Sequence, residues 1–147
     1  PRFRLVRPRT LIYAAIIAVV CLIMLATLVT RSDLDVNILR DRNPLFVTLS
    51  DGSIRNGYTV KIINKQHSSR RFALKVEGLP DSGIDVVGAD ASADRLQVGP
   101  DSLESYRVFV TAPRKALESS STDLRFLVID RDSEAQVVYD SVFRGPE

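Results

Sequence analysis

An uninterrupted run of 21 uncharged residues, residues 10–30, constrains this chain more than any other feature. Residues 11–29 are almost wholly apolar. About 20 helical residues, each rising about 1.5 Å, match the roughly 30 Å hydrocarbon core of a bilayer. The sequence therefore predicts a transmembrane helix over residues 11–30.

A cleaved signal peptide is the alternative reading of this run, because arginines precede it. Signal peptides usually carry about 7–15 apolar residues and end in small residues at the cleavage site. Here the run is longer, and Arg31, Ser32 and Asp33 follow it. The pattern favours an uncleaved anchor.

Charge divides at the same point. Five of the 20 basic residues and none of the acidic ones precede Ser32, so the remaining 116 residues hold 15 basic and 18 acidic groups, a net charge of −3. A mildly acidic domain lacks the basic footprint of nucleic-acid binders.

Four arginines stand before the helix, whereas Arg31, Arg40 and Arg42 are spread over the residues after it. The positive-inside rule then predicts that residues 1–10 are a cytoplasmic basic segment and that residues 34–147 lie across the membrane.

After the helix the sequence alternates between apolar and polar residues. The clearest segment places Phe72, Leu74 and Val76 on one face and Lys75 and Glu77 on the other. Such alternation, broken by turn residues such as Asp and Gly, predicts seven to nine short strands in about 110 residues. This is typical of an all-β, antiparallel sandwich of the immunoglobulin or fibronectin III type. Residues 113–118 are expected to form one helical turn, and residues 119–122 a loop.

Two sets of residues are candidates for contacts with partners. Small residues on one stripe of a membrane helix let a neighbouring helix approach closely, and this predicts a packing face of Ala14, Ala18, Cys21 and Leu25. The second set gathers around one predicted hairpin tip. It is either a docking patch for an acidic lipid or partner, or an ordinary solvated strand surface, and it comprises Lys61, Lys65, His67, Arg70, Arg71 and Lys75.

Residues for catalysis or metal binding are scarce. The chain has one cysteine and one histidine, and it contains no GxSxG, P-loop or CxxC motif. Asp130, Asp132 and Glu134 alternate at a predicted hairpin tip, but they lack the length, the glycine and the terminal bidentate glutamate of an EF-hand loop. A polar turn is therefore favoured over a calcium site. We expect no catalytic residue, cofactor or metal site in this chain.

Four segments carry a resemblance to a known family. They are residues 7–13 (RPRTLIY), 38–46 (ILRDRNPLF), 52–65 (GSIRNGYTVKIINK) and 76–80 (VEGLP). These segments resemble the FixG/CcoG family of cytochrome oxidase accessory proteins, strongly over residues 1–80 and only in pattern over residues 81–147. The corresponding part of the family is its C-terminal part, namely the last membrane helix and an immunoglobulin-like domain.

The resemblance implies a location and a role. Members of the family are bacterial inner-membrane proteins with a ferredoxin-like cytoplasmic part that holds two iron–sulfur clusters, and with a periplasmic C-terminal domain. They are implicated in assembling cbb-type haem–copper oxidases, with a proposed role in copper reduction. This chain would then contact the membrane, the upstream helices of the same protein, and oxidase subunits or copper-handling assembly factors. It has no ferredoxin cysteine cluster, so no redox residue carries over. The alternative is a free-standing bitopic receptor or adhesin-like binding module.

Overall fold

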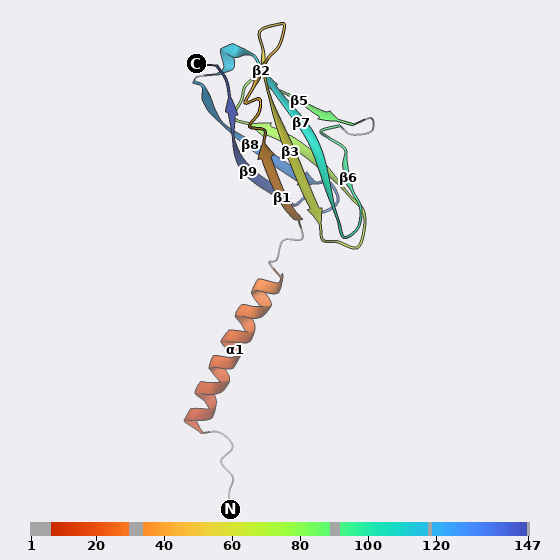
Figure 1. Cartoon of the computed structure of the whole chain (residues 1–147). Helices are drawn as coiled ribbons and strands as arrows, with labels where there is room; N and C mark the ends of the chain where they lie inside the picture. The colour runs from red at the N-terminus through yellow and green to blue at the C-terminus, as the bar shows by residue number, and fades with distance from the viewer. Residues whose placement is uncertain (1–6, 30–33, 89–91, 118, 147) are drawn as a thin grey trace, which may run out of the picture. The chain divides into compact units, whose positions relative to one another are not determined.

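Two compact units make up the chain, residues 1–32 and residues 33–147. The structure is a computed structural model, and it describes residues 7–29, 34–88, 92–117 and 119–146 (Figure 1). The first six residues of the predicted cytoplasmic segment, and residue 30 of the predicted membrane helix, lie outside the described residues.

The first unit contains helix α1, Pro8–Val29, which begins three residues before the predicted helix. Proline is favoured in the first helical turn because its missing N–H would have no helical partner there. The most apolar window of α1 has a mean hydropathy of 2.9, and none of its residues is buried. Of the described residues, only these form a helix long and apolar enough to cross a membrane. The Thr27 hydroxyl donates to the Met24 carbonyl at 2.8 Å, so this polar group is satisfied within the helix.

The second unit is an immunoglobulin-like sandwich of antiparallel strands, as the sequence predicts. One sheet has the order β1-β3-β7-β5, with β2 also paired to β3, and the other has the order β6-β4-β8-β9. Figure 1 shows the two layers, with β1, β3 and β7 in front of β8 and β9. The strands in the described part of the chain are β1 (Leu34–Arg40), β2 (Val47–Thr48), β3 (Ile54–Asn64), β4 (Arg70–Glu77), β5 (Gly83–Val87), β6 (Leu96–Val98), β7 (Ser102–Ala112), β8 (Ser121–Asp130) and β9 (Gln136–Arg144).

The core lies between the sheets and consists of every second residue of the long strands. In β3 the pattern is strict, since residues 54, 56, 58, 60, 62 and 64 are all buried. Tyr58 of one sheet meets Phe126 of the other edge to face, with ring centroids 4.9 Å apart. Such an aromatic pair adds about 0.5–1.5 kcal/mol beyond the area it buries. The period-two pattern therefore identifies the interior correctly.

Strand β4 has the predicted faces, with one exception. Phe72 and Leu74 are 1% exposed, Lys75 and Glu77 are exposed, and Val76 is half-buried. Strict alternation places Ala73 on the solvent side with Lys75, but Ala73 is fully buried. Its side chain is a single methyl group and lies on the central strand opposite the larger Ile129 of β8. The alternation thus fails where a small residue is covered by its neighbours.

One side of the sandwich is closed by hydrogen bonds between the sheets. The buried amide of Asn56 donates to the Arg144 carbonyl at 2.7 Å and accepts from the Arg144 N–H at 3.0 Å. The Tyr58 hydroxyl donates to the Val142 carbonyl at 3.0 Å. These bonds join β3 to β9. The edge strands on the other side are β5 and β6.

The connection between β7 and β8 contains a short 3-10 turn, η1 (Arg114–Ala116), within the segment predicted to form one helical turn. The loop predicted over residues 119–122 is shorter than expected, because β8 begins at Ser121. Ser121 and Thr122 pair with Arg144 and Phe143 of β9. The long partner strand therefore extends β8 into a polar stretch that by itself looks like loop.

Candidate interaction surface

The predicted basic set does not form one surface. Lys61 of β3 and Lys75 of β4 belong to different sheets, and each lies between neighbours that are buried or half-buried. Both lysines therefore face outward, on opposite layers of the sandwich. The fold thus separates two of the six residues that the sequence placed together.

The other four basic residues pair with carboxylates. Lys65 lies 3.6 Å from Asp35, and Arg71 lies 3.1 Å from Asp132. His67 Nδ1 lies 2.5 Å from Asp101, and this contact raises the pKa of His67. Arg70 pairs with Asp130. Acidic groups of β1, the end of β8 and adjacent turns thus offset most of the positive charge at the hairpin tip.

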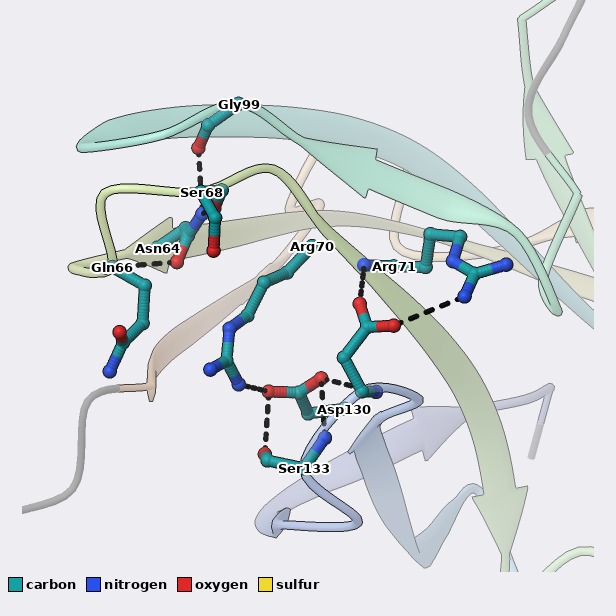
Figure 2. Close-up of polar contacts among 9 residues, drawn as sticks. Asn64, Gln66, Ser68, Arg70, Arg71, Gly99, Asp130 and Ser133 are labelled. Atoms are coloured by element: carbon teal, nitrogen blue, oxygen red, sulfur yellow. Dashed lines mark hydrogen bonds and ion pairs between the residues drawn. The ribbon is translucent and has the colours of Figure 1, made fainter.

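Asp130 is the centre of the tightest polar cluster near this tip. Figure 2 shows Arg70 and Ser133 both pointing at its carboxylate. The Ser133 hydroxyl donates at 2.7 Å and the Asp132 N–H at 2.9 Å, while the Arg70 guanidinium forms an ion pair. Burial alone would raise the pKa of Asp130, but these hydrogen bonds outweigh it and the pKa is lowered. This cluster fixes a turn.

The same contacts bear on the calcium alternative at residues 130–134. The Asp130 carboxylate is bound by Arg70 and by groups of its own turn. Both carboxylate oxygens of Asp132 accept hydrogen bonds from Arg71. Cationic partners compete with a cation for carboxylate oxygens. Among the described residues, no group of three or more His, Cys, Asp or Glu is arranged to hold a metal ion. The arrangement is that of a polar turn.

The buried amide of Asn64 holds the hairpin tip itself. Its side-chain nitrogen donates to the carbonyls of Ser68 and Gly99, each at 2.8 Å, and its oxygen accepts from the Gln66 N–H at 3.0 Å (Figure 2). Three satisfied hydrogen bonds make the burial of a polar amide tolerable. The tip is therefore a fixed turn that is joined to the neighbouring loop.

The predicted packing face of the helix lies on α1. Ala14, Ala18, Cys21 and Leu25 are all exposed, as is every described residue of that helix. The cysteine is a free thiol. Packing against other helices stays a prediction.

The structure reveals a second surface that the sequence analysis missed, and we call it the edge groove. It is an open cavity of about 1200 Å³ beside the edges of β5 and β6, and its lining includes Arg71, Asp94, Arg95, Gln97, Tyr106 and Arg131. These residues come from β4, the turn before β6, β6 itself, β7 and the turn after β8. No spacing in the sequence brings them together, so only the strand order could have pointed to them.

Tyr106 and the Arg131 backbone shape the floor of the edge groove. The Tyr106 hydroxyl of β7 donates to the Gln97 carbonyl of β6, which joins the two sheets at this edge. The Arg131 N–H donates to the Arg71 carbonyl at 2.9 Å, so these two arginines lie on adjacent backbone segments. Arg131 also lies 3.4 Å from Asp94. The groove is thus built on fixed backbone.

Comparison with known proteins gives consistent relatives. The family model described as "IG-like fold at C-terminal of FixG" matches residues 24–146. The nitrogen fixation protein FixG of Rhizobium meliloti is 37% identical over 143 residues, which cover 95% of this chain and 27% of that protein. Protein RdxB of Cereibacter sphaeroides is 38% identical over 141 residues, covering 95% of this chain and 29% of that protein. The chain therefore spans less than a third of the length of these curated relatives.

A solved structure shares the fold. The crystal structure of a FixG-related protein from Vibrio parahaemolyticus superposes with a TM-score of 0.69 at 25% identity. The match covers 80% of this chain and 100% of that one. A domain of this extent has therefore been crystallised by itself.

Proposed function

The chain belongs to the FixG family, whose C-terminal immunoglobulin-like domain it contains, and we propose that it acts as the membrane-anchored interaction domain of a FixG-like accessory protein. The observation that carries this proposal is the extent of the similarity. Matching residues cover 95% of the chain, so they include both the apolar helix and the sandwich. An anchor followed by a sandwich with polar loops is suited to holding a binding surface near a membrane.

We further propose that the domain works by binding and not by catalysis. The polar side chains at the hairpin tip are engaged in turns and ion pairs. An iron–sulfur cluster needs several cysteine thiolates, and the chain has only Cys21, so the clusters implied for the family do not fit onto these residues. In this proposal the sandwich lies in the periplasm of a bacterial inner membrane and supports the biogenesis of a cbb-type haem–copper oxidase. Oxidase subunits or copper-handling factors are its partners.

Deletion of the sandwich from the native protein tests this proposal. Residues 34–147 are removed while α1 is kept, and the cbb-type oxidase in isolated membranes is measured by its haem absorption and oxidase activity. A matched control replaces the sandwich with an unrelated immunoglobulin-like domain of similar size. We expect both variants to reach the membrane at the normal level, as an N-terminal tag reports, and to lose most of the assembled oxidase. A normal oxidase level in the deletion variant would show that the sandwich has no assembly role.

A further inference from the structure

We propose that the edge groove binds an extended, carboxylate-rich segment of a protein partner. The proposal rests on the proposed interaction function and deepens it by naming the surface and the chemistry of its ligand. Three guanidinium groups, those of Arg71, Arg95 and Arg131, line the groove, and one carboxylate, that of Asp94, lines it with them. Asp132, which pairs with Arg71, offsets a second positive charge. Three arginines against two aspartates leave the groove with a small excess of positive charge, although the sandwich as a whole is mildly acidic.

Arg95 and Arg131 are available to a ligand, whereas Arg71 is engaged by Asp132 through both its backbone N–H and its guanidinium. Each guanidinium group has five N–H donors in a planar fork. Arg131 directs one nitrogen toward Asp94 at 3.4 Å, in a pair whose side chains are 51% and 72% exposed. Exposed ion pairs contribute little to stability, so a ligand carboxylate can replace or share such a partner at little cost. Among the described residues, no carboxylate forms an ion pair with Arg95.

The strand pattern indicates an extended ligand. Strand β5 pairs only with residues 107–111 of β7, whereas β3 pairs with all of residues 102–112 on the other side. In the described part of the chain, no strand pairs with residues 102–106 on the side of β5. Ser105 and Tyr106 from this stretch line the groove. An uncovered strand edge is a template for an added strand, and pockets beside it select the side chains of that strand.

The arginines of the groove determine which side chains of an added strand would fit best. A carboxylate accepts two parallel N–H bonds from a guanidinium fork, and such charge-assisted bonds are about twice as strong as neutral ones. The neutral polar groups of Gln97 and Ser105 line the same groove and suit backbone amides. The groove therefore fits a strand with glutamate or aspartate side chains better than an apolar or basic one.

A titration with defined peptides tests the proposal. The full chain is purified in detergent micelles and titrated against a fluorescent ten-residue peptide of alternating glutamate and valine, with anisotropy as the readout. The comparison peptide carries glutamine in place of each glutamate. We expect the glutamate peptide to bind at least about tenfold more tightly, and the difference to shrink as salt screens the charges.

Two double variants locate the binding surface. Arg95→Gln with Arg131→Gln removes two groove charges, and we expect the affinity for the glutamate peptide to fall about tenfold or more. Arg114→Gln with Arg125→Gln removes the same charge from outside the groove lining and should change the affinity less than about twofold. Circular dichroism and the melting midpoint check that both variants fold. If the groove double variant fails to fold, Arg95→Gln alone is used, since no described ion pair depends on it.

Three results would overturn the proposal: no binding of the glutamate peptide, equal binding of both peptides, or an equal loss in the two double variants. The deletion of the sandwich separates this failure from a failure of the proposed function. If the deletion abolishes oxidase assembly and the peptide titration is negative, the domain binds its partner through another face.

Discussion

The Asp41 carboxylate occupies the space that a side chain would need at Gly57. An ideal Cβ atom on Gly57 would lie 2.3 Å from Asp41 Oδ2 and 3.4 Å from the ring of Phe109. The Asp41 N–H donates to the Gly57 carbonyl at 2.9 Å, and the Arg107 guanidinium pairs with the Asp41 carboxylate. A glycine inside a strand often marks such a close approach. Here it lets the loop after β1 lie on the sheet.

Gly57→Ala should destabilise the sandwich by about 1–3 kcal/mol, because the new methyl group displaces the Asp41 carboxylate from its pair with Arg107. Urea unfolding of residues 34–147 measures this change. Gly83→Ala is the matched control, since no atom lies within 4 Å of a Cβ built there. It should stay within about 0.5 kcal/mol.

The double variant Gly57→Ala with Asp41→Ala identifies the cause. If the clash with Asp41 is responsible, the glycine substitution should cost less than about 0.5 kcal/mol once Asp41 is truncated. A cost that is the same in both backgrounds would mean that the Phe109 ring or backbone freedom, and not Asp41, requires the glycine.

Leu74→Ala and Lys75→Ala test the register of β4. Leu74 is 1% exposed in the core, and its truncation should cost about 2–5 kcal/mol through lost burial and the cavity left behind. Lys75 faces outward, so its truncation should stay within about 0.5 kcal/mol. Denaturant melts of both variants give the values. Greater damage from Lys75→Ala would show that the strand has the opposite face inward, because a one-residue slip exchanges the two faces.

The long strands and the fold class could be predicted because their signal is local. Strands β3, β4, β7 and β8 each carry several alternating apolar residues, and the buried residues follow this alternation except at Ala73. The short edge strands β2, β5 and β6 have two to five residues, which is too few for a periodic pattern. These short strands form by pairing with longer strands, so they can be identified only in the structure.

The candidate surfaces could be predicted only in part. The basic residues around the hairpin could be found in the sequence. The sequence could not show that they pair with Asp101, Asp130 and Asp132, which are distant along the chain. The edge groove depends on the order of strands in two sheets, and the sequence does not state that order. The residue types therefore show which side chains are charged, but not which residues those side chains pair with.

Copper binding by the sandwich provides a test that does not involve the groove. Residues 34–147 contain one histidine, His67, and no cysteine or methionine. Copper(I) prefers thiolate and thioether ligands, and imidazole sites need several rings. After exposure to copper and desalting, elemental analysis should find far less than one equivalent. One equivalent of copper that a chelator does not remove would show that the sandwich itself binds copper tightly.

The direction of insertion is tested by reporter fusions after Glu147. The arginines before α1 predict a cytoplasmic N-terminus and a sandwich on the outer side. Alkaline phosphatase is active only outside the cytoplasm, so its fusion should be active, whereas a cytoplasmic fluorescent reporter at the same position should stay dark. The opposite pair of results would reverse the topology and exclude a periplasmic partner.

The pH dependence of unfolding tests the ion pair of Asp130 with Arg70, whose side chains are 3% and 21% exposed. At neutral pH, Asp130→Asn should cost about 2–4 kcal/mol, because it leaves a largely buried guanidinium without its counter-charge. Asp140→Asn is the control, since its pair with Arg125 is solvent-exposed and should contribute less than about 0.5 kcal/mol. Urea melts at a series of pH values from 7 to 3 give the free energies.

The sign of that dependence follows from the lowered pKa of Asp130 in the folded protein. Above about pH 5 the carboxylate is ionised in both the folded and the unfolded chain, so its contribution is fully present. Below the unfolded pKa of about 3.9 the unfolded chain takes up the proton first, and the contribution is lost as the pH falls through the folded pKa. The difference in stability between the natural chain and Asp130→Asn should therefore be constant from pH 7 to about 5 and shrink toward pH 3. A difference that stays constant down to pH 3, or grows, would mean that Asp130 contributes through its shape and hydrogen bonds and not through its charge.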